Sequence, residues 1–228
     1  IRNFKNNLFV KRKDYEELIH YFRNPPTETE NGLNVSPLRY AEPSLNKRSE
    51  FLHDFIKGKI KNRDKILELG CGIGRNLSYL EKEGYCNIFG IDINQEAIRL
   101  SPETYENLRK LKNNLVCSSL ETGLKDYKDS DFHLIFTLCT LMHIHPEVEI
   151  EVFNQISRIT KDYLLTIEME TSIHDTHFPR NYKKIFESRN FIQEEAFHSD
   201  DDTVESQSKF ETQLPLANNL IINNFQFV

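Results

Sequence analysis

A short apolar segment followed by three glycines at alternate positions constrains the fold more than any other feature of the sequence. The apolar segment spans 65–69, and the letters ELGCGIG occupy 68–74. Glycines let the backbone turn sharply and let a ligand approach it closely. A predicted strand, a glycine turn and a helix in this order are typical of open parallel sheets, which bind ligands beyond the carboxyl ends of their strands.

The rest of the chain alternates strand-like and helix-like patterns. We expect Pro102 to interrupt one long helix, because proline lacks a backbone N–H. The alternation predicts an α/β, Rossmann-like, seven-stranded and mostly parallel sheet with helices on both faces and an antiparallel last strand. The expected strands are 65–69, 87–93, 114–118, 132–137, 163–168, 191–198 and about 220–227, and the expected helices are 76–82, 94–112, 146–159 and 181–189.

Two helices are expected before the first strand. One covers 14–23, and the other carries an apolar face at Phe51, Leu52, Phe55 and Ile56 and ends near Gly58. A polar, proline-containing loop at 24–43 separates them. We therefore divide the chain into an N-terminal helical cap or lid, residues 1–58, and a core, residues 59–228.

Composition narrows the classes of partner and compartment. The net charge is −6, so the chain has no overall basic excess of the kind nucleic-acid binders show. No apolar stretch approaches the ~18 residues of a membrane-spanning helix. The four cysteines form no C-x-x-C pair, which favours reduced thiols. We expect a cytoplasmic protein that binds neither nucleic acid nor membrane, and the sequence leaves its oligomeric state open.

The spacing of the glycines separates two kinds of nucleotide site. A dinucleotide site requires G-x-G-x-x-G, but counting from Gly70 its third glycine would be Arg75. The observed pattern, E-x-G-x-G-x-G, resembles motif I of class I S-adenosylmethionine-dependent methyltransferases. The resemblance covers most of 65–170. The strings LELGCGIGRNL and LMHIHPE further resemble bacterial methylases associated with pseudaminic acid and other surface sugars.

A carboxylate follows the second predicted strand at the expected distance. Asp92 lies 18 residues after Gly74 and can accept hydrogen bonds from both ribose hydroxyls. Asn94 is better placed to cap the next helix, which leaves Asp92 for a ligand. After the third strand the family often has an acidic residue that binds adenine, and this chain departs from it with Ser119.

The resemblance implies S-adenosylmethionine as cofactor and assigns its contacts. Glu68 is expected at the methionine amine, and Ile93 is expected to pack on adenine. The remaining expected contacts are Gly70, Cys71, Gly72 and Gly74 at the loop, Ser119 and Leu120 at the base, and Thr137 and Leu138 at the methionine portion.

Transfer to a hydroxyl also requires removal of its proton, a task that suits histidine. His143 and His145, after the fourth strand, are the candidate bases, although His143 is also a candidate for packing. Glu168 ends the fifth strand and is a third catalytic candidate or a solvated strand end. Arg39, Tyr40, His174 and His177 are the candidate substrate-binding residues. No spacing supports a metal site, so none is predicted.

These features favour O-methylation of a small polar metabolite such as a sugar or sugar nucleotide bound for a surface glycan. An amine acceptor and a non-catalytic S-adenosylmethionine-binding module are alternatives. A nicotinamide oxidoreductase is disfavoured by Arg75.

Overall fold

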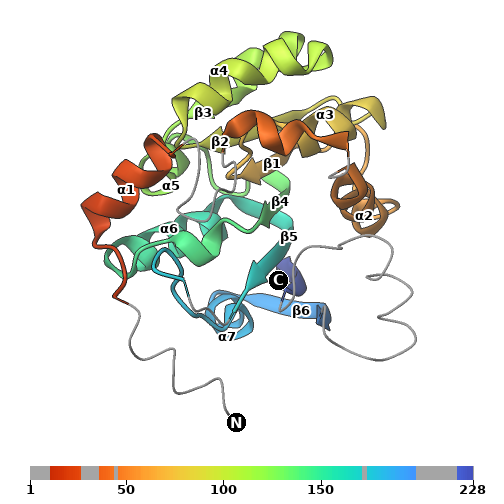
Figure 1. Cartoon of the computed structure of the whole chain (residues 1–228). Helices are drawn as coiled ribbons and strands as arrows, with labels where there is room; N and C mark the ends of the chain where they lie inside the picture. Colours follow the sequence, from red (N-terminus) through yellow and green to blue (C-terminus); the bar gives the residue numbers. More distant parts are fainter. Residues whose placement is uncertain (1–10, 27–35, 44–45, 171–173, 199–219, 228) are drawn as a thin grey trace.

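A single sheet organises the part of the chain that the computed structural model describes, which is residues 11–26, 36–43, 46–170, 174–198 and 220–227 (Figure 1). Its seven strands run in the order β3-β2-β1-β4-β5-β7-β6. Strands β1 to β5 pair in parallel, and β7 is antiparallel to both β5 and β6. The predicted α/β, Rossmann-like and mostly parallel architecture is confirmed. The strands are β1 Ile66–Leu69, β2 Ile88–Asp92, β3 Leu115–Cys117, β4 Phe132–Leu138, β5 Thr160–Met169, β6 Phe191–His198 and β7 Leu220–Phe227.

The long helices follow the predicted pattern with one difference, and the short α5, η2, η5 and η6 were not predicted. The helix expected at 94–112 is divided into α4 and a 3-10 segment, and Pro102 lies inside α4, which continues to Thr104. The α-helices are α1 Tyr15–Arg23, α2 Asn46–Ile56, α3 Arg75–Lys82, α4 Gln95–Thr104, α5 Leu120–Gly123, α6 Pro146–Ile159 and α7 Tyr182–Glu187, and the 3-10 segments are η2 Pro37–Ala41, η4 Glu106–Asn114, η5 Leu124–Asp126 and η6 Leu141–His143.

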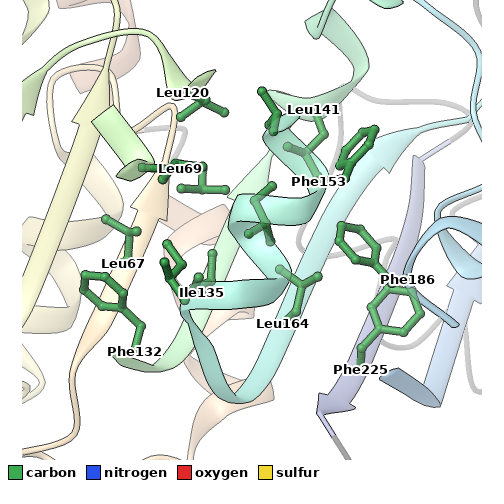
Figure 2. Packing of buried hydrophobic residues seen from close by; sticks show 14 of the residues in the cluster. Leu67, Leu69, Leu120, Phe132, Ile135, Leu141, Phe153, Leu164, Phe186 and Phe225 are labelled. Atoms are coloured by element: carbon green, nitrogen blue, oxygen red, sulfur yellow. The ribbon is translucent and has the colours of Figure 1, made fainter. Parts of the chain in front are cut away.

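Side-chain alternation along β1 gives the sheet an apolar core on each face. Ile66 belongs to a cluster with α2 and α3, whereas Leu67 and Leu69 belong to a second cluster with α5, α6 and α7. Figure 2 shows the second cluster, in which Phe186 of α7 and Phe225 of β7 extend the packing toward the antiparallel edge. Burial on both faces holds the carboxyl ends of the parallel strands in fixed positions.

The two N-terminal helices differ in what they contact. Phe51, Leu52 and Ile56 of α2 are buried in the same cluster as Ile66 of β1, so α2 packs as part of the core. Leu18 of α1 is also buried, at 2% exposure, yet it belongs to neither cluster. Among the described residues, α2 thus shares a cluster with β1, whereas no residue of α1 or η2 belongs to either cluster.

Candidate functional site

One pocket of about 480 Å³ lies beyond the carboxyl ends of β1, β2 and β4. This volume is typical of small-molecule sites. The sequence-predicted residues that line it are Tyr40, Glu68, Gly70, Cys71, Gly72, Asp92, Ile93, Ser119, Leu120, Leu138, His143 and His145. Those outside its lining are Arg39, Gly74, Thr137, Glu168, His174 and His177.

The glycine loop is held by the neighbouring strand and leaves open space above it. The N–H groups of Gly70 and Cys71 donate to the Ile91 carbonyl at 2.8 and 3.1 Å. Gly70 has φ +70°, and a Cβ there would lie 2.1 Å from the Thr140 hydroxyl oxygen. At Gly72, by contrast, a Cβ would meet nothing within 4 Å. The loop therefore offers a bare backbone surface toward the pocket.

Gly74 serves the protein's own packing. It is the N-cap of α3 with φ +81°, a conformation that side chains rarely adopt. A Cβ there would lie 2.7 Å from Leu108 and 2.8 Å from the Ser101 hydroxyl. The predicted ligand contact at Gly74 does not match this placement, because η4 and α4 fill the space beside it.

Asp92 occupies the end of β2, directly across from the loop. Its two carboxylate oxygens accept from the N–H groups of Gly72 at 2.7 Å and Asn94 at 2.8 Å. Burial raises the pKa of Asp92, and these backbone donors oppose the shift. A carboxylate oxygen accepts more than one hydrogen bond, so Asp92 retains capacity for a ligand hydroxyl.

Glu68 is a buried carboxyl with one oxygen unused. Asn76 donates to its Oε1 at 2.6 Å, while Oε2 is buried without a hydrogen-bond partner. Burial raises the pKa of Glu68 to about 8, against the opposing effects of Asn76 and Arg75. An unpartnered buried carboxyl oxygen at the edge of a pocket is costly unless a ligand donor reaches it.

Two guanidinium groups complete this corner of the pocket. Arg75 is 8% exposed and bonds to the Asn76 side-chain oxygen. Arg48, on α2, also lines the pocket. Burial is the main cause of the lowered pKa of Arg75, and the charge of Arg48 lowers it as well. Buried and neighbouring cations favour an anionic ligand group.

The opposite corner lies beyond β3. Ser119 and Leu120 line the pocket there, as does Ile93. The Ser119 hydroxyl faces Thr122 at 3.3 Å. The next residue, Glu121, accepts a hydrogen bond from the Tyr15 hydroxyl at 2.7 Å, which ties α1 to this corner.

Glu168 lies beneath the pocket. It is fully buried and accepts from the Thr137 hydroxyl and from the N–H groups of Thr140, Leu141 and Met142 at 3.0 to 3.1 Å. From the sequence, Glu168 was expected to be either a catalytic residue or a solvated strand end. Four donors on a carboxylate that does not reach the pocket instead make Glu168 the residue that shapes the segment after β4. Thr137 faces this carboxylate and so does not line the pocket as expected.

His143 has a defined tautomer. Its Nδ1 lies 2.9 Å from the Thr176 carbonyl, which only accepts, so Nδ1 carries the proton and Nε2 carries the lone pair. Burial, together with the nearby His177 and His174, lowers the pKa of His143 to about 3, against the opposing effect of the hydrogen bond to Thr176. The ring of Phe22 lies 4.6 Å away. His143 is therefore a neutral hydrogen-bond acceptor in the pocket wall.

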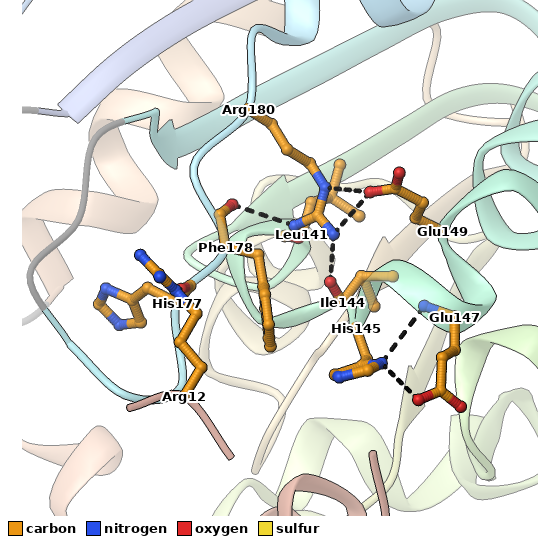
Figure 3. A network of polar contacts seen from close by, with 9 residues as sticks. All are labelled: Arg12, Leu141, Ile144, His145, Glu147, Glu149, His177, Phe178 and Arg180. Atoms are coloured by element: carbon orange, nitrogen blue, oxygen red, sulfur yellow. Dashed lines mark hydrogen bonds and ion pairs between the residues drawn. The ribbon is translucent and has the colours of Figure 1, made fainter. Parts of the chain in front are cut away.

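His145 has the opposite tautomer. Its Nδ1 caps α6 by accepting from the Glu147 N–H at 3.2 Å, so the proton of the neutral ring is on Nε2 (Figure 3). Its ring lies 5.1 Å from Phe178 and 5.8 Å from Tyr15. The Nε2 atom of His143 is thus left to accept a hydrogen bond, and the Nε2–H of His145 is left to donate one.

Arg180 fixes the segment that carries both histidines. It donates to the carbonyls of Leu141, Ile144 and Phe178 and pairs with Glu149 of α6 at 2.9 Å (Figure 3). Its side chain is 5% exposed. Sequence patterns did not single it out, since three of its partners, Leu141, Ile144 and Glu149, lie more than thirty positions away.

Of the four predicted substrate-binding residues, one lines the pocket and three do not. Tyr40 of η2 lines the pocket mouth and is 47% exposed, whereas its neighbour Arg39 does not line the pocket. The ring of His177 packs edge-on against His143 at a centroid distance of 4.8 Å, and the tilted ring of His174 lies 5.0 Å from that of His177. Burial lowers the pKa of His177 to about 4. These two histidines surround His143 and do not reach the pocket.

Helix α1 belongs to the cap or lid expected at 1–58. Five α1 residues line the pocket, Tyr15, Leu18, Ile19, Tyr21 and Phe22. The amphipathic pattern predicts the helix and its apolar side, but does not say whether that side faces a core or a cavity. Among the described residues no cluster of side chains suits a metal ion, and no helix is long and apolar enough to cross a membrane.

Comparison with known proteins agrees with this arrangement. Residues 66–163 match the family model described as "Methyltransferase domain". A search of curated proteins gives no match.

Among solved structures, magnesium protoporphyrin IX methyltransferase from Synechocystis PCC 6803 with bound SAM is 11% identical, with TM-score 0.64 over 92% of this chain and 95% of that chain. A SAM-dependent methyltransferase from Archaeoglobus fulgidus is 19% identical, with TM-score 0.58 over 93% and 100%. Geranyl diphosphate C-methyltransferase from Streptomyces coelicolor A3(2) is 11% identical, with TM-score 0.60 over 80% and 77%. At these identities the likeness is one of fold.

Proposed function

We propose an O-methylation reaction for this chain, which is a class I S-adenosylmethionine-dependent methyltransferase by its methyltransferase domain at 66–163 and its fold. One observation carries the proposal. A single pocket joins the glycine loop and Asp92 to His143 and His145. The site therefore provides both a nucleoside cradle and a proton acceptor.

The residues of the cradle fit the cofactor. Gly72 leaves the space above the loop open, and Asp92 has spare acceptor capacity for ribose hydroxyls. We assign Ile93, Ser119 and Leu120 to the adenine, since they line the corner beyond β2 and β3.

The methionine portion carries an ammonium and a carboxylate, and the corner at Glu68 offers a partner for each. The unpartnered Oε2 of Glu68 suits the ammonium. The guanidinium groups of Arg48 and Arg75 suit the carboxylate, because Arg recognises carboxylates through paired N–H donors. Cys71 and Leu138 supply the intervening apolar wall.

When bound, S-adenosylmethionine supplies a methyl group already activated by a sulfonium. The protein must hold an acceptor oxygen in line with that group, and such positioning contributes roughly 7–11 kcal/mol. The Nε2 lone pair of His143 accepts the hydroxyl proton, and the Nε2–H of His145 orients the acceptor. Glu168 and Arg180 act as positioning residues, because each binds the backbone of the segment after β4.

We assign α1 and η2 as the lid of the cap predicted at 1–58. Tyr15, Phe22 and Tyr40 line the pocket, and Tyr15 is hydrogen-bonded to Glu121. A lid at this position excludes water from the methyl group. The part of the predicted loop at 27–35 lies outside the described residues.

A sugar or sugar-nucleotide acceptor, the class favoured by sequence, remains an alternative. Two of the similar solved structures are a magnesium protoporphyrin IX methyltransferase and a geranyl diphosphate C-methyltransferase, and neither named substrate is a sugar. An amine acceptor also fits the pocket, since a neutral amine needs no base before attack.

Calorimetry with S-adenosylhomocysteine followed by turnover with radiolabelled S-adenosylmethionine tests the proposal. We expect saturable binding and label on an acceptor oxygen. No heat with the nucleoside would refute the cradle, and label found only on nitrogen or carbon would refute O-methylation.

A further inference from the structure

We propose that the acceptor is an uncharged phenol or enol with a flat apolar body, an inference that rests on the O-methylation proposed above. It follows from how charge, aromatic side chains and the two histidines are distributed around the pocket. The cofactor end is the part of the lining from α2, β1, α3, β2 and α5, and the acceptor end is the part from α1, η2, the segment after β4 and the first turn of α6.

Charge is confined to the cofactor end. Among the described lining residues, the charged side chains are Arg48, Glu68, Arg75, Asp92 and Glu121, and all come from cofactor-end elements. The acceptor end contributes no Asp, Glu, Lys or Arg to that lining. The nearest charges lie at its boundary with the cofactor end, where Arg48 acts on Tyr40 and Cys139 and Glu121 accepts from Tyr15. A charged acceptor held beside His143, away from that boundary, would bury its charge without a counter-ion, which is costly.

The acceptor end is rich in apolar and aromatic surface. Its lining includes Leu18, Ile19, Phe22, Pro37, Tyr40 and Met142. Leu18 is 2% exposed although it belongs to neither core cluster, so its burial depends on the pocket wall. Rings pack face to edge on such side chains and gain more than their buried area alone. The hydroxyls of Tyr15, Tyr21, Tyr40 and Thr140 also belong to this lining, but its apolar side chains replace none of the hydrogen bonds that a polyhydroxylated ring makes with water.

The two histidines define the polar part of the acceptor. His143 offers one acceptor atom and His145 offers one donor. A matching molecule presents one hydroxyl, which donates to His143, and one further oxygen, which accepts from His145.

The proton balance favours an acidic hydroxyl. The acceptor oxygen forms a bond to the methyl carbon, the carbon–sulfur bond breaks with its electron pair on sulfur, and the hydroxyl proton passes to His143 Nε2. Burial lowers the pKa of His143 to about 3, so it is a weak base. A phenol, with a pKa near that of tyrosine at about 10, yields its proton to a weak base more readily than an alkyl alcohol does.

The test uses acceptors that differ in one property. The full chain, saturated with S-adenosylhomocysteine, is titrated with methyl 4-hydroxybenzoate, with 4-hydroxybenzoate, with methyl glucoside and with UDP-glucose. Turnover of each is then measured with labelled S-adenosylmethionine. We expect the neutral ester to bind and react at least about tenfold better than its carboxylate analogue, because only the carboxylate buries a charge.

The outcomes separate this inference from the proposed function. Preference for either sugar compound, or for the carboxylate, overturns the acceptor class while leaving O-methylation in place. Failure of the neutral ester to bind the saturated chain also overturns it. Failure of S-adenosylhomocysteine itself to bind refutes the cofactor cradle instead.

A charge placed in the wall gives a second test. Phe22→Lys puts a cation beside His143, and Phe22→Leu is the matched control that keeps the wall apolar. We expect Phe22→Lys to reverse the preference toward 4-hydroxybenzoate, with affinity for S-adenosylhomocysteine unchanged. An unchanged preference in Phe22→Lys would place the acceptor elsewhere and overturn the inference.

Discussion

The two ends of the pocket are built in different ways. The cofactor end relies on backbone groups and charged side chains that lie mostly within one continuous stretch, 68–121. The acceptor end relies on neutral side chains brought together from distant parts of the chain, as in the contact of Phe22 with His143. The first arrangement recognises a constant ligand through fixed dipoles, and the second selects a ligand by shape and by the cost of unpaired polar groups.

The same contrast separates two buried carboxyls. Glu168 has donors on both oxygens from the protein itself, whereas Glu68 leaves Oε2 unpartnered. A buried carboxylate whose oxygens all accept hydrogen bonds from the protein has a structural role, whereas one with an unpartnered oxygen at a pocket indicates a ligand.

The largest expected effect is at Glu168. Replacing it with Ala leaves the Thr137 hydroxyl and three backbone N–H groups without an acceptor. We expect a loss of about 3 kcal/mol in the free energy of unfolding, measured by urea denaturation. Glu168→Gln keeps one acceptor oxygen and should lose less. Equal stability of Glu168→Ala and the parent chain would remove the distinction between the two carboxyls.

His143→Ala comes next and tests the acceptor end alone. We expect kcat to fall about 100-fold, the lower range for loss of a general base, with affinity for S-adenosylhomocysteine unchanged. His143→Gln supplies an acceptor oxygen and should recover part of the rate. A fall in nucleoside affinity of the same size would show that the two ends are not separate.

Asp92→Asn tests the cofactor end. The amide replaces one acceptor oxygen by a donor, so contacts to Gly72 or Asn94 and to the ribose are weakened together. We expect affinity for S-adenosylhomocysteine to fall about 30-fold by calorimetry, consistent with loss of a charged hydrogen bond. The apparent KM for the acceptor, measured at saturating cofactor, should stay the same. Ser119→Ala is a control at the same end with a smaller expected loss.

The smallest expected effect is the change in nucleoside affinity with pH that follows from the proton on Glu68. Its pKa of about 8 means that binding an ammonium must release a proton below that pH. We expect nucleoside affinity to weaken by up to about tenfold as pH falls from 8 to 7. Calorimetry in buffers of different ionisation enthalpy should count the proton, and Glu68→Gln should abolish the count.

The stability of the unliganded chain should respond to pH with opposite signs at the two ends. The raised pKa of Glu68 stabilises the fold below its ordinary value of 4.5, and this contribution is lost as pH rises toward 8. The lowered pKa of His143 stabilises the fold above its ordinary value of 6.5, and this contribution is lost as pH falls toward 3. Glu68→Gln and His143→Gln should each flatten one side of the profile.

The cofactor end was predictable because its signals are local. A strand, a glycine turn and a carboxylate at a fixed spacing place Gly70, Gly72 and Asp92 without knowledge of the rest of the fold. Gly74 and Thr137 were placed differently because their surroundings, Leu108 and Glu168, belong to other elements.

The acceptor end was only partly predictable. His143 and His145 follow directly from their position after β4, but their tautomers depend on Thr176 and on the start of α6. Glu168 was expected near the ligand-binding edge of the sheet, yet Thr137 of the neighbouring β4 and the segment after β4 donate to it and enclose the side chain. Contacts across a hundred or more positions, such as Tyr15 with Glu121, have no local signal.

Helix α1 spans the distance between the two ends, with Tyr15 bonded to Glu121 and Phe22 beside His143. Any free energy that one ligand spends or gains in ordering this helix is therefore shared with the other ligand. Linkage then requires the nucleoside to change the acceptor's affinity by the same factor as the acceptor changes the nucleoside's. A nine-residue helix thus gives the enzyme a thermodynamic reason to hold both reactants together or neither.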